Sequence, residues 1–163
     1  MLQCKYRESN MTREKFTTLG KEQLIDLLMH FMVSDSKKVC TPSEAYTSLL
    51  AFISLEDCVT NEHFFSITLD GAHKVIDVHL VSKGLVNRTL VHPREVFRPA
   101  IADNAVAIVV AHNHPSGILE PSEEDVDVTR RLKKAGDLLG IKVLDHLIFS
   151  PTEYHSMVEY GEF

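Results

Sequence analysis

This 163-residue sequence has few cysteines, no long apolar run and no excess of positive charge, and each of these features excludes a class of protein. The three cysteines, Cys4, Cys40 and Cys58, are odd in number and far apart. They cannot form a disulfide framework or a Cys-x-x-Cys metal knuckle, so a reducing cytoplasm is the expected location. No apolar stretch approaches the roughly 20 residues that span a bilayer, and no signal peptide opens the sequence. We therefore expect no membrane association.

Acidic residues outnumber basic ones by 23 to 17, which gives a formal net charge of −6. This balance argues against a large basic surface for nucleic acid, although it leaves room for a local patch. With 44% apolar and 25% charged residues, the chain is expected to form one globular domain. We place this domain at residues 41–163 and treat residues 1–40 as an N-terminal arm with a short helix over Lys21–Val33.

Apolar periodicity from residue 41 onward predicts alternating helices and strands. Helices are expected where a capping residue or a proline precedes a helical repeat, and strands where apolar and β-branched residues run together. The predicted strands are His63–Leu69, Val75–Val81, Val106–Ala111 and Val143–Phe149, and the predicted helices start at Pro42 and Pro93 and cover Ser122–Leu139. This interleaving predicts an α/β (α+β) fold with three layers around a mixed sheet.

Two of the predicted helices carry more detailed expectations. Pro99 falls inside the helix that starts at Pro93 and should kink or shorten it. The helix over Ser122–Leu139 should bury one apolar stripe, because its apolar residues recur at helical spacing. The expected stripe consists of Val128, Leu132, Ala135 and Leu139.

Potential metal ligands gather where the strand Val106–Ala111 ends. His112 and His114 lie one residue apart at that point, and Asp125 follows eleven residues later. Asp125 precedes Leu132 by seven residues, so it shares the core-facing stripe of the helix. A buried carboxylate needs a compensating partner, and a metal ion shared with two imidazoles provides one. Three such ligands with a fourth position left for water are typical of a catalytic zinc site.

The same acidic residue also has an interpretation that needs no metal. The stretch from Ser122 to Asp125 fits a helix capping box, in which the serine hydroxyl accepts a backbone N–H. Capping accounts for Ser122 and Asp125, but it does not explain why His112 and His114 precede them.

The spacing of these residues resembles the JAMM motif of the JAB/MPN metalloprotease superfamily, which reads His-x-His, seven residues, Ser, two residues, Asp. The matching residues are His112, His114, Ser122 and Asp125. Residues 91–97, 112–117 and 143–146 resemble the bacterial RadC branch of that superfamily, and the likeness covers about residues 42–163. Longer RadC proteins carry an N-terminal helix-hairpin-helix module, which residues 1–40 are too short to supply in full.

The resemblance implies a JAB/MPN-like three-layer fold and one zinc ion, with His112, His114 and Asp125 as the metal ligands. It also implies roles for Glu62 as general acid/base and for Ser122 as a hydrogen-bond donor to the developing oxyanion. The implied activity is zinc-dependent hydrolysis of peptide or isopeptide bonds by a metal-activated water. The substrate would be a peptide or protein of unknown identity.

Several alternatives stay open at this point. Glu95 is a rival for the acid/base role, although a glutamate in the first turn of a helix usually serves the helix dipole. His146 is either a neighbour of the metal ligands or half of a buried hydrogen-bonded pair. The whole domain could instead be a non-catalytic, metal-stabilised accessory module in DNA repair, recombination or mobile-element transfer, or a metal-free interaction domain.

Overall fold

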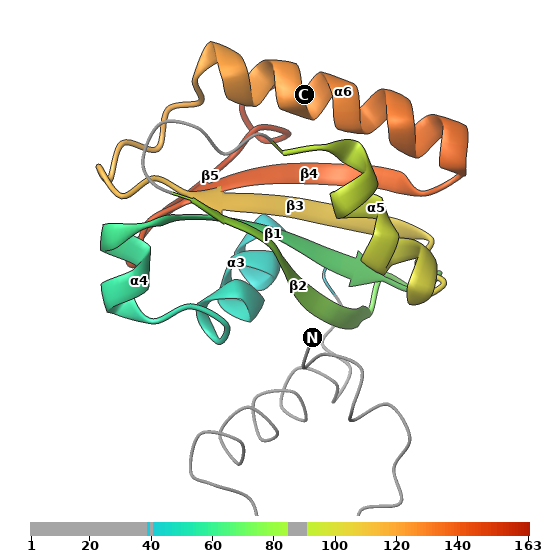
Figure 1. Ribbon diagram of the computed structural model, residues 1–163, viewed down its shortest axis with the longest axis horizontal. Helices are drawn as coiled ribbons and strands as arrows, with labels where there is room; N and C mark the ends of the chain where they lie inside the picture. The colour runs from blue at the N-terminus through green and yellow to red at the C-terminus, as the bar shows by residue number, and fades with distance from the viewer. Residues whose placement is uncertain (1–38, 40, 85–90) are drawn as a thin grey trace, which may run out of the picture. The chain divides into compact units, whose positions relative to one another are not determined.

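A five-stranded mixed sheet forms the centre of the structure, a computed structural model that describes residues 39, 41–84 and 91–163. The strand order is β2-β1-β3-β4-β5 (Figure 1). β3 and β4 run parallel, and the other neighbouring strands pair antiparallel. In chain order the elements are α3 (Pro42–Leu50), α4 (Leu55–Thr60), β1 (Glu62–Leu69), β2 (Val75–Gly84), α5 (Pro93–Ala102), β3 (Ala107–Asn113), α6 (Glu123–Leu139), β4 (Lys142–Phe149) and β5 (Tyr154–Ser156).

Helices cover both faces of this sheet and complete three layers (Figure 1). Successive residues of a strand point to opposite faces. Phe65 therefore packs with residues of α3 and α4, including Leu49 and Cys58, whereas Phe64 packs with the core under α5 and α6 that contains Leu132. The predicted fold class, a three-layer α+β arrangement around a mixed sheet, is confirmed.

The central strand β3 is buried along its whole length. It has β1 on one side and β4 on the other, and both of its faces are covered. This explains why Val106–Ala111 is apolar without alternation. The strand continues to Asn113, two residues beyond the predicted end, so His112 belongs to the sheet.

The starts of the helices follow the local signals in the sequence. Thr41 and Glu44 form a capping box at α3, and His92 is the N-cap of α5. Pro99 lies inside α5, but the helix continues to Ala102, so the proline does not end it. None of the described helices combines the length and apolarity needed to cross a membrane. The predicted helix over Lys21–Val33 lies outside the described residues.

One position of the predicted stripe on α6 is wrong. Leu139 is 46% exposed, and the fully buried positions of this helix are Thr129, Leu132 and Gly136. Leu139 borders an open groove between α5 and α6, which Ile101 also lines. Nothing in the described part of the chain covers this groove, so the helical periodicity alone overestimated the burial of the last turn.

Gly136 is the point of closest packing between α6 and the chain that enters β4. A Cβ atom there would overlap the carbonyl oxygen of Ile141 and would lie 3.3 Å from side-chain atoms of Phe97 and Val143. The same region is closed by hydrogen bonds from the amides of Gly140 and Ile141 to the Gly136 carbonyl. The absence of a side chain at Gly136 thus allows the helix to approach β4.

Replacement of this glycine should destabilise the protein. Gly136→Ala is expected to lower the free energy of unfolding by about 1–3 kcal/mol, because the added methyl overpacks a backbone contact that cannot move freely. An exposed helical position would respond in the opposite direction, by about 1 kcal/mol. Urea denaturation followed by circular dichroism measures the change, with Gly71→Ala as control because no atom lies within 4 Å of a Cβ at Gly71. An unchanged or higher stability of Gly136→Ala would contradict this packing argument.

Candidate metal centre

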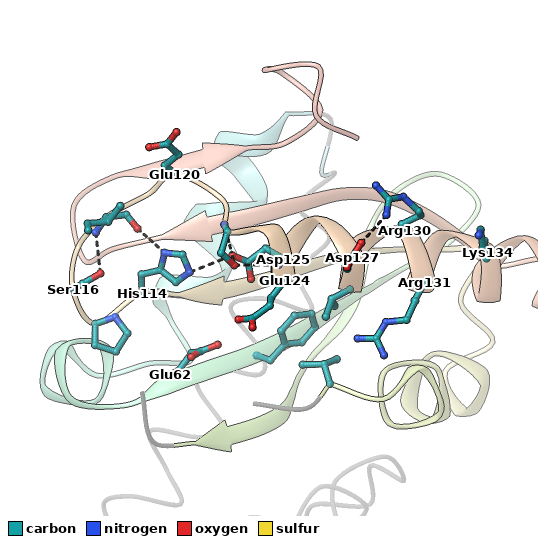
Figure 2. A pocket seen from close by; sticks show the side chains of 16 residues that line it. Glu62, His114, Ser116, Glu120, Glu124, Asp125, Asp127, Arg130, Arg131 and Lys134 are labelled. Carbon is teal, nitrogen blue, oxygen red and sulfur yellow. Dashed lines mark hydrogen bonds and ion pairs between the residues drawn. The ribbon is translucent and has the colours of Figure 1, made fainter. Parts of the chain in front are cut away.

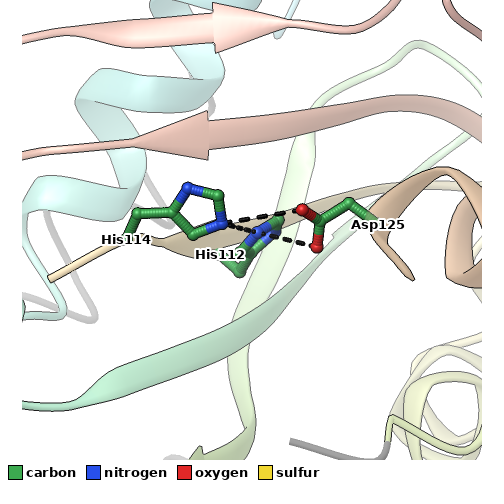
Figure 3. A group of neighbouring side chains, drawn as sticks. All are labelled: His112, His114 and Asp125. Atoms are coloured by element: carbon green, nitrogen blue, oxygen red, sulfur yellow. Dashed lines mark hydrogen bonds and ion pairs between the residues drawn. The ribbon is translucent and has the colours of Figure 1, made fainter. Parts of the chain in front are cut away.

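The end of β3 and the first turn of α6 bring three potential metal ligands together (Figure 3). His112 is buried and lies between Phe64 of β1 and Ile148 of β4 in the sheet. Its Nε2 atom lies 2.9 Å from Nε2 of His114 and 3.1 Å from Oδ1 of Asp125. Nε2 of His114 lies 3.6 Å from Oδ2 of Asp125. The structure therefore places the three predicted ligands in one cluster.

Asp125 also closes the capping box that the sequence suggested as an alternative. The backbone N–H and the hydroxyl of Ser122 donate to Oδ2 of Asp125 at 2.8 and 2.6 Å, and the Asp125 N–H donates back to the serine hydroxyl. Oδ1 is left to face His112. The two interpretations are thus compatible, because the cap holds the carboxylate in the orientation that the histidines require.

A chain of buried hydrogen bonds determines which nitrogen of His112 carries its proton. The Thr129 hydroxyl donates to the Asp125 carbonyl oxygen at 2.6 Å, so its oxygen is left to accept the Nδ1–H of His146. Nε2 of His146 is then an acceptor, and it lies 2.8 Å from Nδ1 of His112. We infer that His112 is protonated on Nδ1 and directs the lone pair of Nε2 at the cluster.

The other two histidines complete this pattern. Nδ1 of His114 donates to the carbonyl oxygen of Ile118 at 2.6 Å, which leaves Nε2 of His114 facing the cluster as well. His146 is fully buried, and burial together with the neighbouring His112 holds the pKa of its imidazole well below the usual value. His146 therefore stays neutral, and it hydrogen-bonds both Thr129 and the potential metal ligand His112.

The cluster needs a positive charge at its centre. Two imidazole lone pairs and a carboxylate face one another, and such groups are stable together only around a proton or a metal ion. Ligand atoms bound to zinc at 2.0–2.2 Å in tetrahedral geometry lie about 3.4 Å apart. The observed separations of 2.9, 3.1 and 3.6 Å lie within about 0.5 Å of that spacing, so the donor set of His112, His114 and Asp125 fits a divalent ion after a small adjustment.

In the metal-free protein a proton takes this place, and the pKa values reflect it. The hydrogen bond with Asp125 raises the pKa of His114 above 6.5, against the opposing effect of burial. Burial raises the pKa of Asp125, but the hydrogen bonds of His112 and His114 outweigh it and hold this pKa far below 3.8.

The cluster opens into a cleft of about 860 Å³ (Figure 2). Glu62, at the start of β1, lines this cleft together with Ser122, His114 and Asp125. The negative charge of Glu62 contributes to the raised pKa of His114. Glu95 does not line the cleft, and its carboxylate is paired with Arg94 and Arg98 on α5. The geometry therefore favours Glu62 over Glu95 as the acid/base candidate.

Asn113 supports the start of β1 and was not singled out from the sequence. Its side-chain oxygen accepts the N–H of His63 at 2.8 Å, and its amide donates to the carbonyl oxygens of Cys58 and Asn61. These contacts fix the backbone on both sides of Glu62. The sequence signal was available, since Asn113 is the middle residue of His-Asn-His, but its partners lie some 50 residues earlier.

A second group of potential ligands, also unpredicted, consists of Asp77, His79 and Asp103. Nε2 of His79 lies 2.6 Å from Oδ2 of Asp103, and the Thr68 hydroxyl donates to the same oxygen at 2.7 Å. The carboxylate of Asp103 at the end of α5 thus has two protein partners, and this group does not line the cleft.

Removal of the Thr129 hydroxyl should weaken metal binding although none of the three ligands is replaced. In Thr129→Val the Nδ1–H of His146 loses its acceptor, so the proton of His146 can move to Nε2. Nε2 of His146 then donates to Nδ1 of His112, and the proton of His112 must move to its own Nε2, the nitrogen that would bind the metal. Zinc affinity is expected to fall by about 10–100-fold. Competition with a chromogenic chelator measures it. Ser48→Ala is the control, because Ser48 makes the same bond to a carbonyl four residues earlier on α3. Equal zinc affinities in both variants would contradict the proton chain.

The stability of the metal-free protein should also depend on pH, and this dependence should require Asp125. The raised pKa of His114 contributes stability that is present below pH 6.5 and lost as pH rises through the folded-state value. The lowered pKa of Asp125 contributes stability that is present above pH 3.8 and lost on acidification. In EDTA, the free energy of unfolding of the wild type should therefore fall as the pH rises above about 6.5. Asp125→Asn should flatten that slope, and identical slopes would contradict the assignment.

Comparison of the chain with known proteins identifies its family. The family model for a RadC-like JAB domain matches residues 39–162. A UPF0758 protein of Geotalea uraniireducens is 49% identical over 100 residues, which cover 61% of this chain and 44% of that protein. A UPF0758 protein of Staphylococcus haemolyticus is 44% identical over 126 residues, which cover 77% of this chain and 54% of the relative. The match thus spans about half the length of these relatives. The chain belongs to the family of RadC-like JAB domains.

Proposed function

We propose that this chain is a zinc-dependent hydrolase of the JAMM type that cleaves peptide or isopeptide bonds through a metal-activated water. The observation that carries the proposal is the convergence of His112, His114 and Asp125 beside an open cleft, which His114, Asp125 and Glu62 line. A purely structural metal site is normally closed by four protein ligands. Three ligands beside a cleft match a catalytic site better.

His112, His114 and Asp125 would hold the ion. A zinc ion bound there supplies Lewis acidity and lowers the pKa of water in its coordination sphere towards about 7. The protein orients the ligands: His146 and Thr129 keep the lone pair of His112 directed at the ion. The cap at Ser122 fixes the carboxylate of Asp125.

Glu62 moves the proton in this scheme. It lines the same cleft as His114 and Asp125, so it can take a proton from a water beside them. It then delivers this proton to the nitrogen of the leaving amine, which would otherwise depart as an unstable anion. Asn113 supports this step by fixing the backbone around Glu62 through His63 and Asn61.

Ser122 is proposed to stabilise the oxyanion that forms when the amide carbonyl is attacked. Its hydroxyl lines the cleft and donates to Oδ2 of Asp125 in the structure, so it must rotate towards the substrate during the reaction. Its backbone N–H still caps the same carboxylate oxygen after that rotation. The hydrogen bond to the oxyanion would contribute about 3 kcal/mol if well placed.

The decisive test separates proton transfer from metal binding. Glu62→Gln is expected to retain about one zinc per chain, because Glu62 is not among the three ligands, and to lose about 10²–10⁴-fold in hydrolysis rate. Elemental analysis measures the zinc, and a library of quenched-fluorescence peptides and isopeptides measures the cleavage. Glu95→Gln is the matched control and should leave both quantities unchanged.

The possible negative results distinguish the hydrolase from the two other functions. Zinc-loaded wild type that cleaves no member of the library would contradict the hydrolase proposal and leave the metal-stabilised accessory role. Protein without stoichiometric zinc would remove both of these readings and favour a metal-free interaction domain.

A further inference from the structure

The cleft does not end at the metal centre but continues along α6 (Figure 2). Glu124, Val128 and Arg131 follow one another on the side of α6 that borders it, at spacings of four and three residues. The charge of the lining changes sign along this path. Along α6 the lining carboxylates Glu124, Asp125 and Asp127 come first, and the cations Arg130, Arg131 and Lys134 follow (Figure 2). The apolar lining residues include Phe64, Val91 and Val128.

Two adjacent arginines of α6 differ in how their charge is used. Arg130 also lines the cleft, but its Nη1 donates to Oδ1 of Asp127 at 2.6 Å, and Figure 2 shows its side chain turned away from Glu124 and Glu62. The Arg131 side chain extends on the same side of the helix as Glu124 (Figure 2). Within the described part of the chain Arg131 forms no ion pair. Its guanidinium is therefore available to a ligand in the cleft.

A guanidinium without an ion pair, in a cleft whose lining also includes apolar side chains, is suited to a carboxylate. Its planar donors match the two oxygens of an aspartate or glutamate side chain, and Lys134, three residues later, adds a second positive charge. Arg131 lies six residues after the metal ligand Asp125 on the same helix, which is a rise of about 9 Å along the axis. An extended peptide advances about 3.3 Å per residue, so this distance corresponds to about three residues.

We propose that Arg131 is a specificity-determining residue that binds an acidic side chain of the substrate, about three residues from the cleaved bond. The inference rests on the proposed hydrolase function and narrows its substrate class to peptides with an aspartate or glutamate at that distance.

The charge pattern favours a peptide over a nucleic acid as the occupant. A phosphate backbone would place repeated negative charges along the whole cleft, including beside Glu62, Glu120 and Glu124. The net charge of −6 adds to that repulsion. A peptide can instead meet Arg131 with one carboxylate and keep neutral or basic residues at the metal end.

Peptide hydroxamates test the inference without any need for turnover. The hydroxamate group binds zinc and fixes the register, so a single Glu, Gln or Lys can be moved through the second to fourth residues from either end of the peptide. Binding to zinc-loaded protein is measured by fluorescence anisotropy at low ionic strength. We expect Glu to bind about fivefold more tightly than Gln at one of these positions, and the difference to shrink with added salt.

Charge reversal at the two arginines provides the matched comparison. Arg131→Glu should lose the preference for Glu and favour the Lys peptide, whereas Arg130→Glu should retain the wild-type preference. Equal responses of the two variants, or no discrimination between Glu and Gln in the wild type, would overturn the proposal. So would a single-stranded DNA oligonucleotide that displaces the peptides in an Arg131-dependent manner. Failure of every hydroxamate to bind zinc-loaded protein would instead refute the open metal centre and the inference with it.

Discussion

Two imidazole nitrogens and one carboxylate face each other between the end of β3 and the first turn of α6, and this contact requires a cation. The β3–α6–β4 crossover creates it, because a helix that links two parallel strands begins at the edge where the first strand ends. The partial positive charge at the helix N-terminus favours a carboxylate there. Asp125 is thus placed opposite His112 by chain topology before any metal binds.

A layer of polar side chains supports this contact inside an otherwise apolar core. His146 and Thr129 are buried, and His146 lies beside Phe64, whose ring stacks on that of His112 with centroids 6.0 Å apart. Their hydrogen bonds are strengthened by the low dielectric of these surroundings, and leaving any one unpaired would be costly. The same network that stabilises α6 against the sheet also selects the protonation state of His112, a potential metal ligand. In the proposed function, stability and metal binding would therefore be coupled through these two residues.

In the proposed function, the cleft would extend this arrangement to the substrate. One helix would provide a metal ligand in its first turn and an arginine about two turns later, so the reacting bond and a specificity contact would be held by the same rigid element. The opposite wall contributes Glu62, which the Asn113 side chain ties to the end of β3. Relative positions across the cleft therefore depend on the register between β1 and β3, not on a mobile loop.

The sequence by itself determined the order of helices and strands and the capping of α6, because these features depend on periodicities within a few residues. It also indicated that His112, His114 and Asp125 lie close together, because they flank a single connection between a strand and a helix. Glu62 came only from family resemblance, since a glutamate at a strand start carries no local signal. Tertiary structure alone decided the proton position on His112, the support from Asn113 and the exposure of Leu139. Thr129 and His146 are 17 residues apart, and His112 and His146 are 34 apart. Contacts at such separations follow from sheet register and helix docking, which sequence periodicity does not encode.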